Sequence, residues 1–271
     1  MQLTKAIVSS NEDPRYLDFW PYVSKTWRDL IGIEPVLFFT GCFSRVAELS
    51  RWGRIIRVEE SPQWDTGNQA RSIRLWAGTQ FPDDNIIVSD LDMLPISREY
   101  YLGSVADAAE DSLVSYTSDI LKYGFYVKAP QLPMCYLAAK GSTFNEILGI
   151  SPETSWEQLV KIMKAPNWAY GTDQRFFWSC FNRWPGKEGR YLGLNRGWSS
   201  WWGGMIAVKR LDKVSWPGDK YQVRDFYDCH LPLPLSENRE KCMGLFNKLG
   251  LCTEESGPSS GIRPMRDGGG P

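Results

Sequence analysis

Four short apolar runs, rich in β-branched and aromatic residues, occur in the first third of the chain. Each run is followed by polar residues or glycine, and each intervening segment is long enough to hold a crossover connection. This alternation is typical of a parallel sheet whose strands are joined by helices. The predicted strands are Lys5–Ser9, Pro35–Thr40, Arg54–Val58 and Asn85–Ser89.

Two of these connections carry apolar residues at helical spacing. In the range 16–30 they follow Asp13–Pro14, a pair that favours the start of a helix. In Asn68–Thr79 the apolar residues fall on one helical face. Residues 1–96 are therefore predicted to form an α/β, Rossmann-like half.

The second half, residues 97–252, shows a mixed pattern with no internal repeat. Its predicted strands are Ser112–Tyr116, Met134–Ala138 and Gly203–Val208, and its predicted helices are Ser142–Leu148, Trp156–Met163, Thr172–Asn182 and Glu237–Leu249. One domain over residues 1–252 is expected at this length. The tail, 253–271, is rich in Gly, Pro and Ser, so it is predicted to be disordered.

Composition narrows the classes of partner and compartment. The 31 basic and 32 acidic residues leave a net charge of −1, which gives no overall field to attract duplex nucleic acid. The six cysteines are scattered without a CxxC pair, which favours reduced thiols in a cytoplasm. No leader and no apolar stretch of about 20 residues is present, so neither secretion nor a membrane span is predicted.

The segment Asn85–Pro95 carries the sharpest chemical signal. An apolar strand ends at Ser89 and is followed by Asp90 and Asp92, separated by one residue. In open α/β sheets ligands bind at the carboxyl ends of the strands, so these two carboxylates are expected in a binding crevice. Such oxygen ligands suit Mg²⁺ or Mn²⁺, which usually also binds substrate phosphates. An isolated DxD is often a solvated loop, and the preceding strand is what favours a metal site.

The run Ile86–Ile96 resembles the strand and DxD motif of GT-A glycosyltransferases. Its continuation, Ser97–Tyr101, is similar to the small glycosyltransferase domains of large algal (chlorella) viruses. The resemblance implies a GT-A central, mostly parallel sheet flanked by helices, with a nucleotide-sugar-binding half followed by an acceptor-side half. It also implies a nucleoside diphosphate sugar as donor, with UDP-glucose favoured, a Mn²⁺ or Mg²⁺ ion, a glycan acceptor and, for a viral protein, the host cytoplasm.

By the same resemblance, the loop after the first strand would contact the nucleotide. Ser9, Ser10 and Asn11 are the candidates to meet base and ribose, and an ordinary Asx turn is the alternative. Asp90 and Leu91 are expected to contact the donor as well.

The helix before the DxD strand supplies two arginines. Arg71 and Arg74 are candidates to meet phosphate or sugar hydroxyls, because a guanidinium presents planar donors. The alternative is a solvated helix face.

His230 is the single histidine of the chain. The resemblance implies that it completes the metal shell with Asp90 and Asp92, and imidazole is a common Mn²⁺ ligand. A purely structural histidine is the alternative. Asp228 is a weaker candidate for the same shell, and Asp225 could equally be a loop acid.

Asp173 follows Thr172 at a predicted helix start. The resemblance makes it the candidate base that takes the proton of an acceptor hydroxyl, which favours inversion. The alternative is a helix cap at Thr172 or Asp173. A retaining reaction needs no such base and stays open.

Trp198, Trp201 and Trp202 could form a platform for an acceptor sugar or simply fill the core.

Two rival functions are a nucleotidyltransferase acting on sugar phosphates and a non-catalytic carbohydrate-binding module. The range 9–13 has neither glycine nor a basic residue, which counts against the phosphate loop of a nucleotidyltransferase. Mn²⁺-dependent nucleotide binding would distinguish an enzyme from a binding module.

Overall fold

The computed structural model describes residues 1–252 except 43, 45, 46, 63, 118–131, 164–171, 195–197, 202, 203, 208 and 219. At 198–201 and 204–207 it describes the backbone alone. The predicted disordered tail, 253–271, and the three candidate platform tryptophans therefore lie outside the described side chains.

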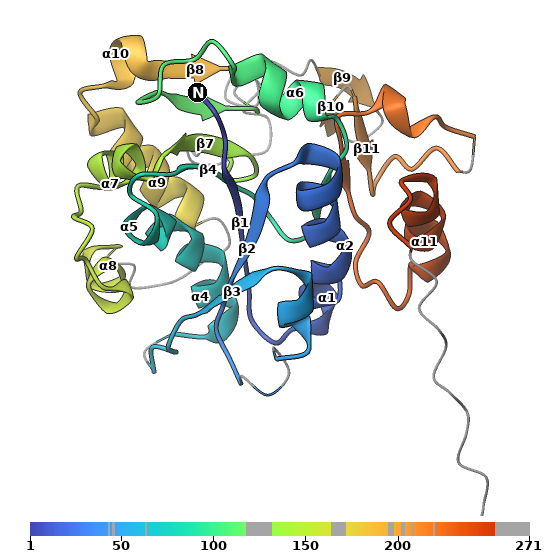
Figure 1. Ribbon diagram of the computed structural model, residues 1–271, viewed down its shortest axis with the longest axis horizontal. Coiled ribbons are helices and arrows are strands. Elements are labelled where there is room, and N and C mark those ends of the chain that lie inside the picture. The colour runs from blue at the N-terminus through green and yellow to red at the C-terminus, as the bar shows by residue number, and fades with distance from the viewer. Residues whose placement is uncertain are drawn as a thin grey trace, which may run out of the picture.

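A seven-stranded sheet forms the centre of the molecule (Figure 1). Its strand order is β3-β2-β1-β4-β7-β6-β8. The first four of these strands are mutually parallel, whereas β7 runs antiparallel to β4 and β6. The strands are β1 Lys5–Ser10, β2 Glu34–Phe39, β3 Arg54–Arg57, β4 Asn85–Val88, β6 Leu113–Ser115, β7 Leu137–Lys140 and β8 Tyr191–Gly193. The predicted α/β class with a mostly parallel sheet is confirmed.

Helices cover both faces of this sheet, so its central strands are apolar on both sides. Along β1, Ala6 and Val8 enter one buried cluster while Ile7 enters the other. The first cluster is covered by α1 Pro14–Leu17, α2 Trp20–Lys25 and the π-helix η1 Thr26–Ile31. The second is covered by α4 Thr66–Ser72, the 3₁₀ helix η3 Ile73–Trp76, α5 Ala77–Gln80, α7 Gly141–Leu148, α8 Trp156–Met163 and α9 Thr172–Arg183.

Both helices predicted in the first half are broken into shorter pieces. The range 16–30 is interrupted before α2, where Pro21 occupies one of the first two helical positions and has no N–H to continue a preceding helix. The range 68–79 tightens to 3₁₀ geometry at Ile73 and returns to α geometry at Ala77.

A second, three-stranded sheet follows the DxD segment, in the order β11-β12-β5. The strands are β5 Met93–Pro95, β11 Arg210–Asp212 and β12 Asp228–His230. Since β4 ends at Val88 and β5 begins at Met93, residues 89–92 cross from one sheet to the other. Strands of three residues are too short to show a period of two, so the sequence predicted none of them.

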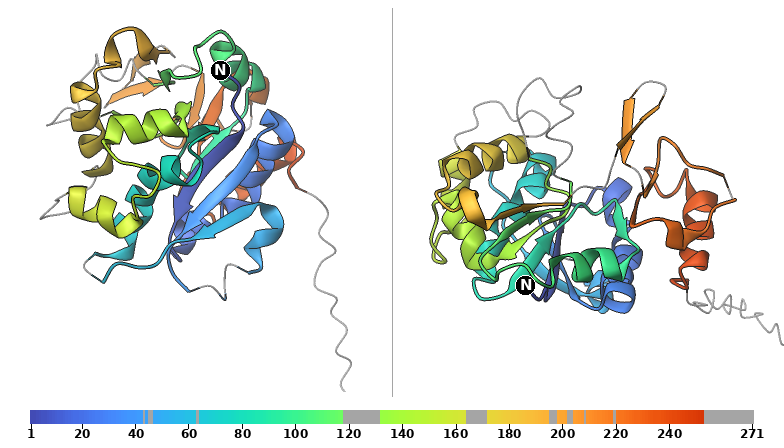
Figure 2. Two further views of the ribbon diagram at one scale, coloured as in Figure 1. Left: turned by 60° about the vertical axis from the view of Figure 1, so that its left-hand side comes forward. Right: turned by 90° about the horizontal axis from the view of Figure 1, so that it is seen from above.

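The remaining elements surround these sheets. They are η2 Leu49–Trp52, α6 Arg98–Leu102, η4 Gly103–Val105, α10 Lys187–Arg190, the antiparallel pair β9 Trp198–Trp201 and β10 Gly204–Ala207, η6 Val223–Asp225 and α11 Arg239–Lys248. Figure 2 shows α11 beside the blue helices of the N-terminal part, where the Tyr22 and Phe246 rings stack with their centroids 3.9 Å apart.

One buried cluster includes both Met1 and Leu251, and a single domain over 1–252 stays our prediction. Among the described residues, no helix is long and apolar enough to cross a membrane.

The end of the described chain supports a prediction about truncation. Leu251 is buried, and its carbonyl accepts a hydrogen bond from Lys25 Nζ at 2.9 Å. A chain that ends at Cys252 should keep the melting temperature of the full protein, because it retains both contacts. A chain that ends at Leu249 should lose about 1.5–3 kcal/mol of stability from the lost apolar burial. Thermal unfolding of the two shortened chains tests this, and equal melting temperatures would contradict it.

Candidate active site

The loop after β1 and the DxD segment lie at the same edge of the central sheet. In the β1–β4 register Ile7 is opposite Val88, and the Ser89 N–H donates to the Ile7 carbonyl at 2.9 Å. Two residues further along each chain, Ser9 and Asp90 are therefore level with each other. This is the carboxyl edge, where ligands bind in such folds.

The two aspartates of the motif point to different partners. A turn, in which the Met93 N–H donates to the Asp90 carbonyl at 3.2 Å, holds the segment between the two sheets. Asp90 is directed to Arg74, and Asp92 to His230. The Leu91 side chain is buried, so only its backbone can face a donor.

Arg74, Asp90 and Asp173 form the first group of the site. Arg74 lies in η3 and is 4% exposed, and its Nη2 donates to Asp173 Oδ2 at 2.7 Å. Its Nη1 pairs with Asp90 Oδ1. Burial lowers the pKa of Arg74, but the charges of the two aspartates outweigh this and raise it, so the guanidinium stays charged.

This group bears on two roles suggested by the sequence, which both stay predictions. In this ligand-free arrangement the Arg74 guanidinium is paired with two carboxylates. Asp173 is 3% exposed and paired with Arg74, so donor binding would have to release its carboxylate before it could take a proton. Without a donor, Asp173 holds Arg74, and Arg74 holds Asp90.

Asp92, His230, Asp212 and Lys213 form the second group. His230 Nε2 lies 3.2 Å from Asp92 Oδ2, and its Nδ1 lies 3.4 Å from Asp212 Oδ2. The small sheet sets this arrangement, because His230 is paired with Met93 of β5 on one side and with Asp212 of β11 on the other.

The charges of this group reinforce one another. Burial lowers the pKa of His230, but the hydrogen bonds to Asp212 and Asp92 outweigh it and raise the pKa to about 8. Burial likewise acts to raise the pKa values of Asp92 and Asp212, yet the hydrogen bonds with His230 hold both below their usual range. Without a metal, the imidazole is therefore protonated at neutral pH.

The second group partly fits a divalent cation. A carboxylate and an imidazole are suitable ligands for Mn²⁺, and a carboxylate on the other ring nitrogen is the usual way to fix the tautomer of a metal-binding histidine. Within the described ranges, no three His, Cys, Asp or Glu side chains are grouped so that they could hold one ion. The structure thus brings Asp92 and His230 together, while Asp90, the third predicted ligand, is turned to Arg74.

The other predicted metal ligands lie elsewhere. Asp228 is completely buried and paired with Arg210 at 3.1 Å, which makes it part of the framework. Asp225 is exposed in η6.

The loop after β1 forms the Asx turn that the sequence suggested as the alternative for these residues. Asn11 Oδ1 accepts from the Asp13 N–H at 3.1 Å, and Asn11 Nδ2 donates to Thr66 Oγ1 at 3.1 Å. Ser10 is buried, with its hydroxyl donating to the Asn11 carbonyl at 2.9 Å, whereas Ser9 is partly exposed. The loop is therefore fixed in position, and Ser9 has the more accessible side chain of the two serines.

Arg71 remains exposed and donates to Asn68 Oδ1 at 2.9 Å. Its charge and that of Asp92 both act on Tyr16: burial and then Asp92 raise the pKa of this phenol, and Arg71 lowers it. Tyr16 therefore lies near the second group, and nothing in the sequence marked it.

A groove of about 470 Å³ opens at the carboxyl ends of β2 and β3. Its lining residues are Gly41, Cys42, Arg57, Val58, Glu59 and Glu60. Glu12, in the loop after β1, accepts a hydrogen bond from the Cys42 N–H, so the groove adjoins that loop. This space continues the ligand-binding edge of the sheet.

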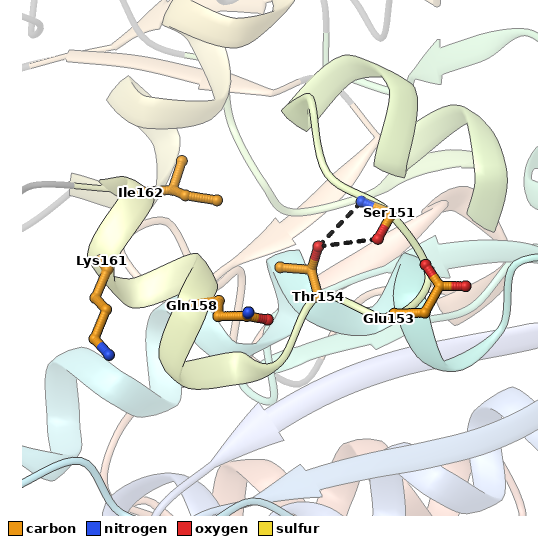
Figure 3. Close-up of a pocket in the computed structure, with 6 residues that line it drawn as sticks. All are labelled: Ser151, Glu153, Thr154, Gln158, Lys161 and Ile162. Atoms are coloured by element: carbon orange, nitrogen blue, oxygen red, sulfur yellow. Dashed lines mark hydrogen bonds between the residues drawn. The ribbon is translucent and has the colours of Figure 1, made fainter.

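A second cavity, of about 420 Å³, lies at the start of α8 (Figure 3). The Ser151 N–H donates to Thr154 Oγ1 there at 3.0 Å, and Lys161 is paired with Glu157 at 3.0 Å. None of the predicted site residues lines it.

The sequence matches no family model and no curated protein. The fold, however, is similar to those of solved glycosyltransferases. The galactosyltransferase LgtC in complex with donor and acceptor sugar analogs is 12% identical, with a TM-score of 0.50 over 93% of this chain and 98% of LgtC. An active-site mutant of LgtC is 11% identical, with a TM-score of 0.51 over the same shares. GlyE of Streptococcus pneumoniae TIGR4 is 11% identical, with a TM-score of 0.47 over 92% of this chain and 63% of GlyE. The likeness to LgtC shows a fold of the glycosyltransferase type.

Proposed function

We propose that the protein is a metal-dependent glycosyltransferase that moves a sugar from a nucleoside diphosphate sugar to an acceptor hydroxyl of a glycan. The observation that carries the proposal is the Asp92–His230 pair at the carboxyl edge of a glycosyltransferase-type sheet. The favoured donor is UDP-glucose, and the proposed location is the cytoplasm, that of the host for a viral protein.

Asp92 and His230 would hold a Mn²⁺ or Mg²⁺ ion, which neutralises the negative charge on the leaving diphosphate. Asp212 keeps the imidazole oriented through its Nδ1. Arg74 and Asp173 fix the carboxylate of Asp90, which faces the same edge and completes the donor site. Arg71 is exposed on the helix before the motif and is the arginine that can approach the phosphates.

The nucleotide would lie along the edge formed by the ends of β1, β2 and β3. Ser9 and the backbone of the loop after β1 would contact it, and the adjoining groove has room for the base or ribose. Carboxylates such as those of Glu59 and Glu60 accept hydrogen bonds from ribose hydroxyls.

Inversion stays our proposal for the stereochemistry, and it now carries a condition. Asp173 can act as the base only if donor binding releases it from Arg74. The anomeric configuration of the first product, read by NMR, tests this directly, and a retained configuration would remove the base role.

Thermal unfolding with UDP-, GDP-, CMP- and dTDP-sugars, each with and without Mn²⁺, tests the function. A ligand bound only by the folded state raises the melting temperature, so one nucleotide sugar should do so only with Mn²⁺. Stabilisation by free sugars without metal would favour a carbohydrate-binding module. Stabilisation by a sugar phosphate with a nucleoside triphosphate would favour a nucleotidyltransferase.

His230 gives a separate prediction with a defined pH range. Metal binding needs a neutral imidazole, and the pKa of His230 without metal is about 8. Mn²⁺ affinity should therefore rise with pH and level off above pH 8, instead of near the ordinary histidine pKa of ~6.5. In His230→Gln the affinity should be lower and should lose this pH dependence, as measured by Mn²⁺ titration.

Stability without metal should change in the opposite direction. Because the pKa of His230 is raised on folding, its contribution is fully present below about pH 6.5 and is lost as pH rises through 8. Denaturant unfolding of wild type and His230→Gln across this range is the control, and parallel pH profiles would contradict both expectations.

A further inference from the structure

Lys213 lies directly after β11 and next to the proposed metal ligands, and no motif in the sequence singles it out. Its Nζ is 3.5 Å from Asp92 Oδ2. This is the same oxygen that His230 Nε2 approaches at 3.2 Å. One carboxylate oxygen thus has both an ammonium and an imidazole within 3.5 Å, and a cation bound to Asp92 would lie beside both.

The contact between Lys213 and Asp92 is an ion pair without a hydrogen bond, since 3.5 Å exceeds the usual N–H···O range. Asp92 is 8% exposed, whereas the Lys213 side chain is partly exposed. The ammonium therefore neutralises a buried charge from the solvent side, on a flexible stem that can move away.

The net charge of the group rises when a cation binds. With the imidazole neutral, as a metal requires, the carboxylates of Asp92 and Asp212 outweigh the Lys213 ammonium by one charge. A divalent cation turns this into a surplus of one positive charge. Lys213 and the cation then repel each other, and an anion is needed beside them.

We propose that Lys213 is the counter-cation of Asp92 in the metal-free protein and binds the leaving diphosphate in the metal-loaded complex. The proposal rests on the proposed function, because the diphosphate belongs to the donor. Lys213 would leave Asp92 when the cation arrives, and its ammonium would donate hydrogen bonds to an oxygen of the β-phosphate. The same side chain thereby weakens metal binding alone and strengthens nucleotide binding once metal is present.

Lys213→Met removes the charge and keeps a stem of similar length, so it separates these two effects. Mn²⁺ should bind about three to ten times more tightly to the variant, since a competing positive charge is gone. UDP should bind about 10 to 100 times more weakly at saturating Mn²⁺, since a charge-assisted hydrogen bond is lost. UMP, which lacks the β-phosphate, should bind both proteins equally. The measurements are Mn²⁺ titration by electron paramagnetic resonance and calorimetry with UDP and UMP.

Two further variants make the result decisive. Lys213→Arg keeps the charge and should restore most of the UDP affinity, and Lys220→Met changes an exposed lysine of the same region and should change nothing. Unchanged UDP affinity in Lys213→Met would overturn the diphosphate role. Unchanged or weaker Mn²⁺ binding would overturn the counter-cation role. If wild type binds Mn²⁺ but no UDP, the proposed function and the diphosphate role fail together, and the Mn²⁺ titration still decides the counter-cation role.

Discussion

Replacing Asp92 by alanine should abolish Mn²⁺-dependent nucleotide binding and lower turnover by roughly a thousandfold. The physical reason is that Asp92 is the one described carboxylate in contact with both His230 and Lys213, at the place proposed for the cation. Loss of the cation removes several kcal/mol of charge stabilisation from the transition state, and about 1.4 kcal/mol corresponds to each factor of ten. Calorimetry with UDP and Mn²⁺, together with a transfer assay, measures both effects.

The same substitution should also lower the stability of the fold, which the removal of an exposed aspartate would not do. Asp92 is 8% exposed, and its removal leaves two positively charged side chains without their shared partner. A cost of about 1–3 kcal/mol is expected for a charged group left unsatisfied. Asp92→Asn keeps the shape but removes the charge, so it separates the loss of packing from the loss of charge, and Asp225→Ala is the exposed control. Undiminished Mn²⁺-dependent UDP binding in Asp92→Ala would remove Asp92 from the metal site.

The first four strands of the central sheet could be predicted closely, and three of them, β1, β2 and β4, are largely buried. Continuous apolar runs give a clear signal, and the predicted and observed limits of β1 to β4 differ by at most one residue at each end. The position of the DxD segment could be predicted from these strands, because strand direction decides at which edge of the sheet the carboxyl ends lie. The fold class is thus a property of local patterns that the sequence displays.

The partners within the site could not be predicted in the same way. His230 meets Asp92 only because β12 lies between β5 and β11, and strands of three residues leave no periodic signal. Asp212 and Lys213 reach the site through the same small sheet. The Asp92–His230 contact spans 138 residues of sequence, and the His230–Asp212 contact spans 18.

The two arginines show a further limit. Arg71 and Arg74 are three residues apart, so a continuous α-helix would place them on nearly the same face. In the structure Arg74 is buried while Arg71 stays exposed. Their spacing alone therefore could not show which of the two is accessible to a phosphate.

Replacing Asp173 by alanine should lower the free energy of unfolding by about 3–5 kcal/mol, because it leaves the buried charge of Arg74 with one fewer partner. Arg74→Met should have a cost of similar size, since Asp173 is 3% exposed and has its ion pair there. The double variant Arg74→Met with Asp173→Leu should be less unstable than the sum of the single changes, because no unpaired charge remains between the two positions.

The same variants distinguish a positioning role from a catalytic base. If Asp173 fixes Asp90 through Arg74, Asp173→Asn should lose stability and weaken donor binding together, and Arg74→Lys should show the same combination. If Asp173 is the base, Asp173→Asn should lower turnover about 10²–10⁴-fold while donor affinity stays unchanged. Denaturant unfolding, calorimetry with the donor and Mn²⁺, and turnover on one set of variants therefore give opposite patterns. The first pattern is expected if the Asp173 carboxylate stays 2.7 Å from Arg74 Nη2 and closed to solvent, and the second is expected if donor binding releases it.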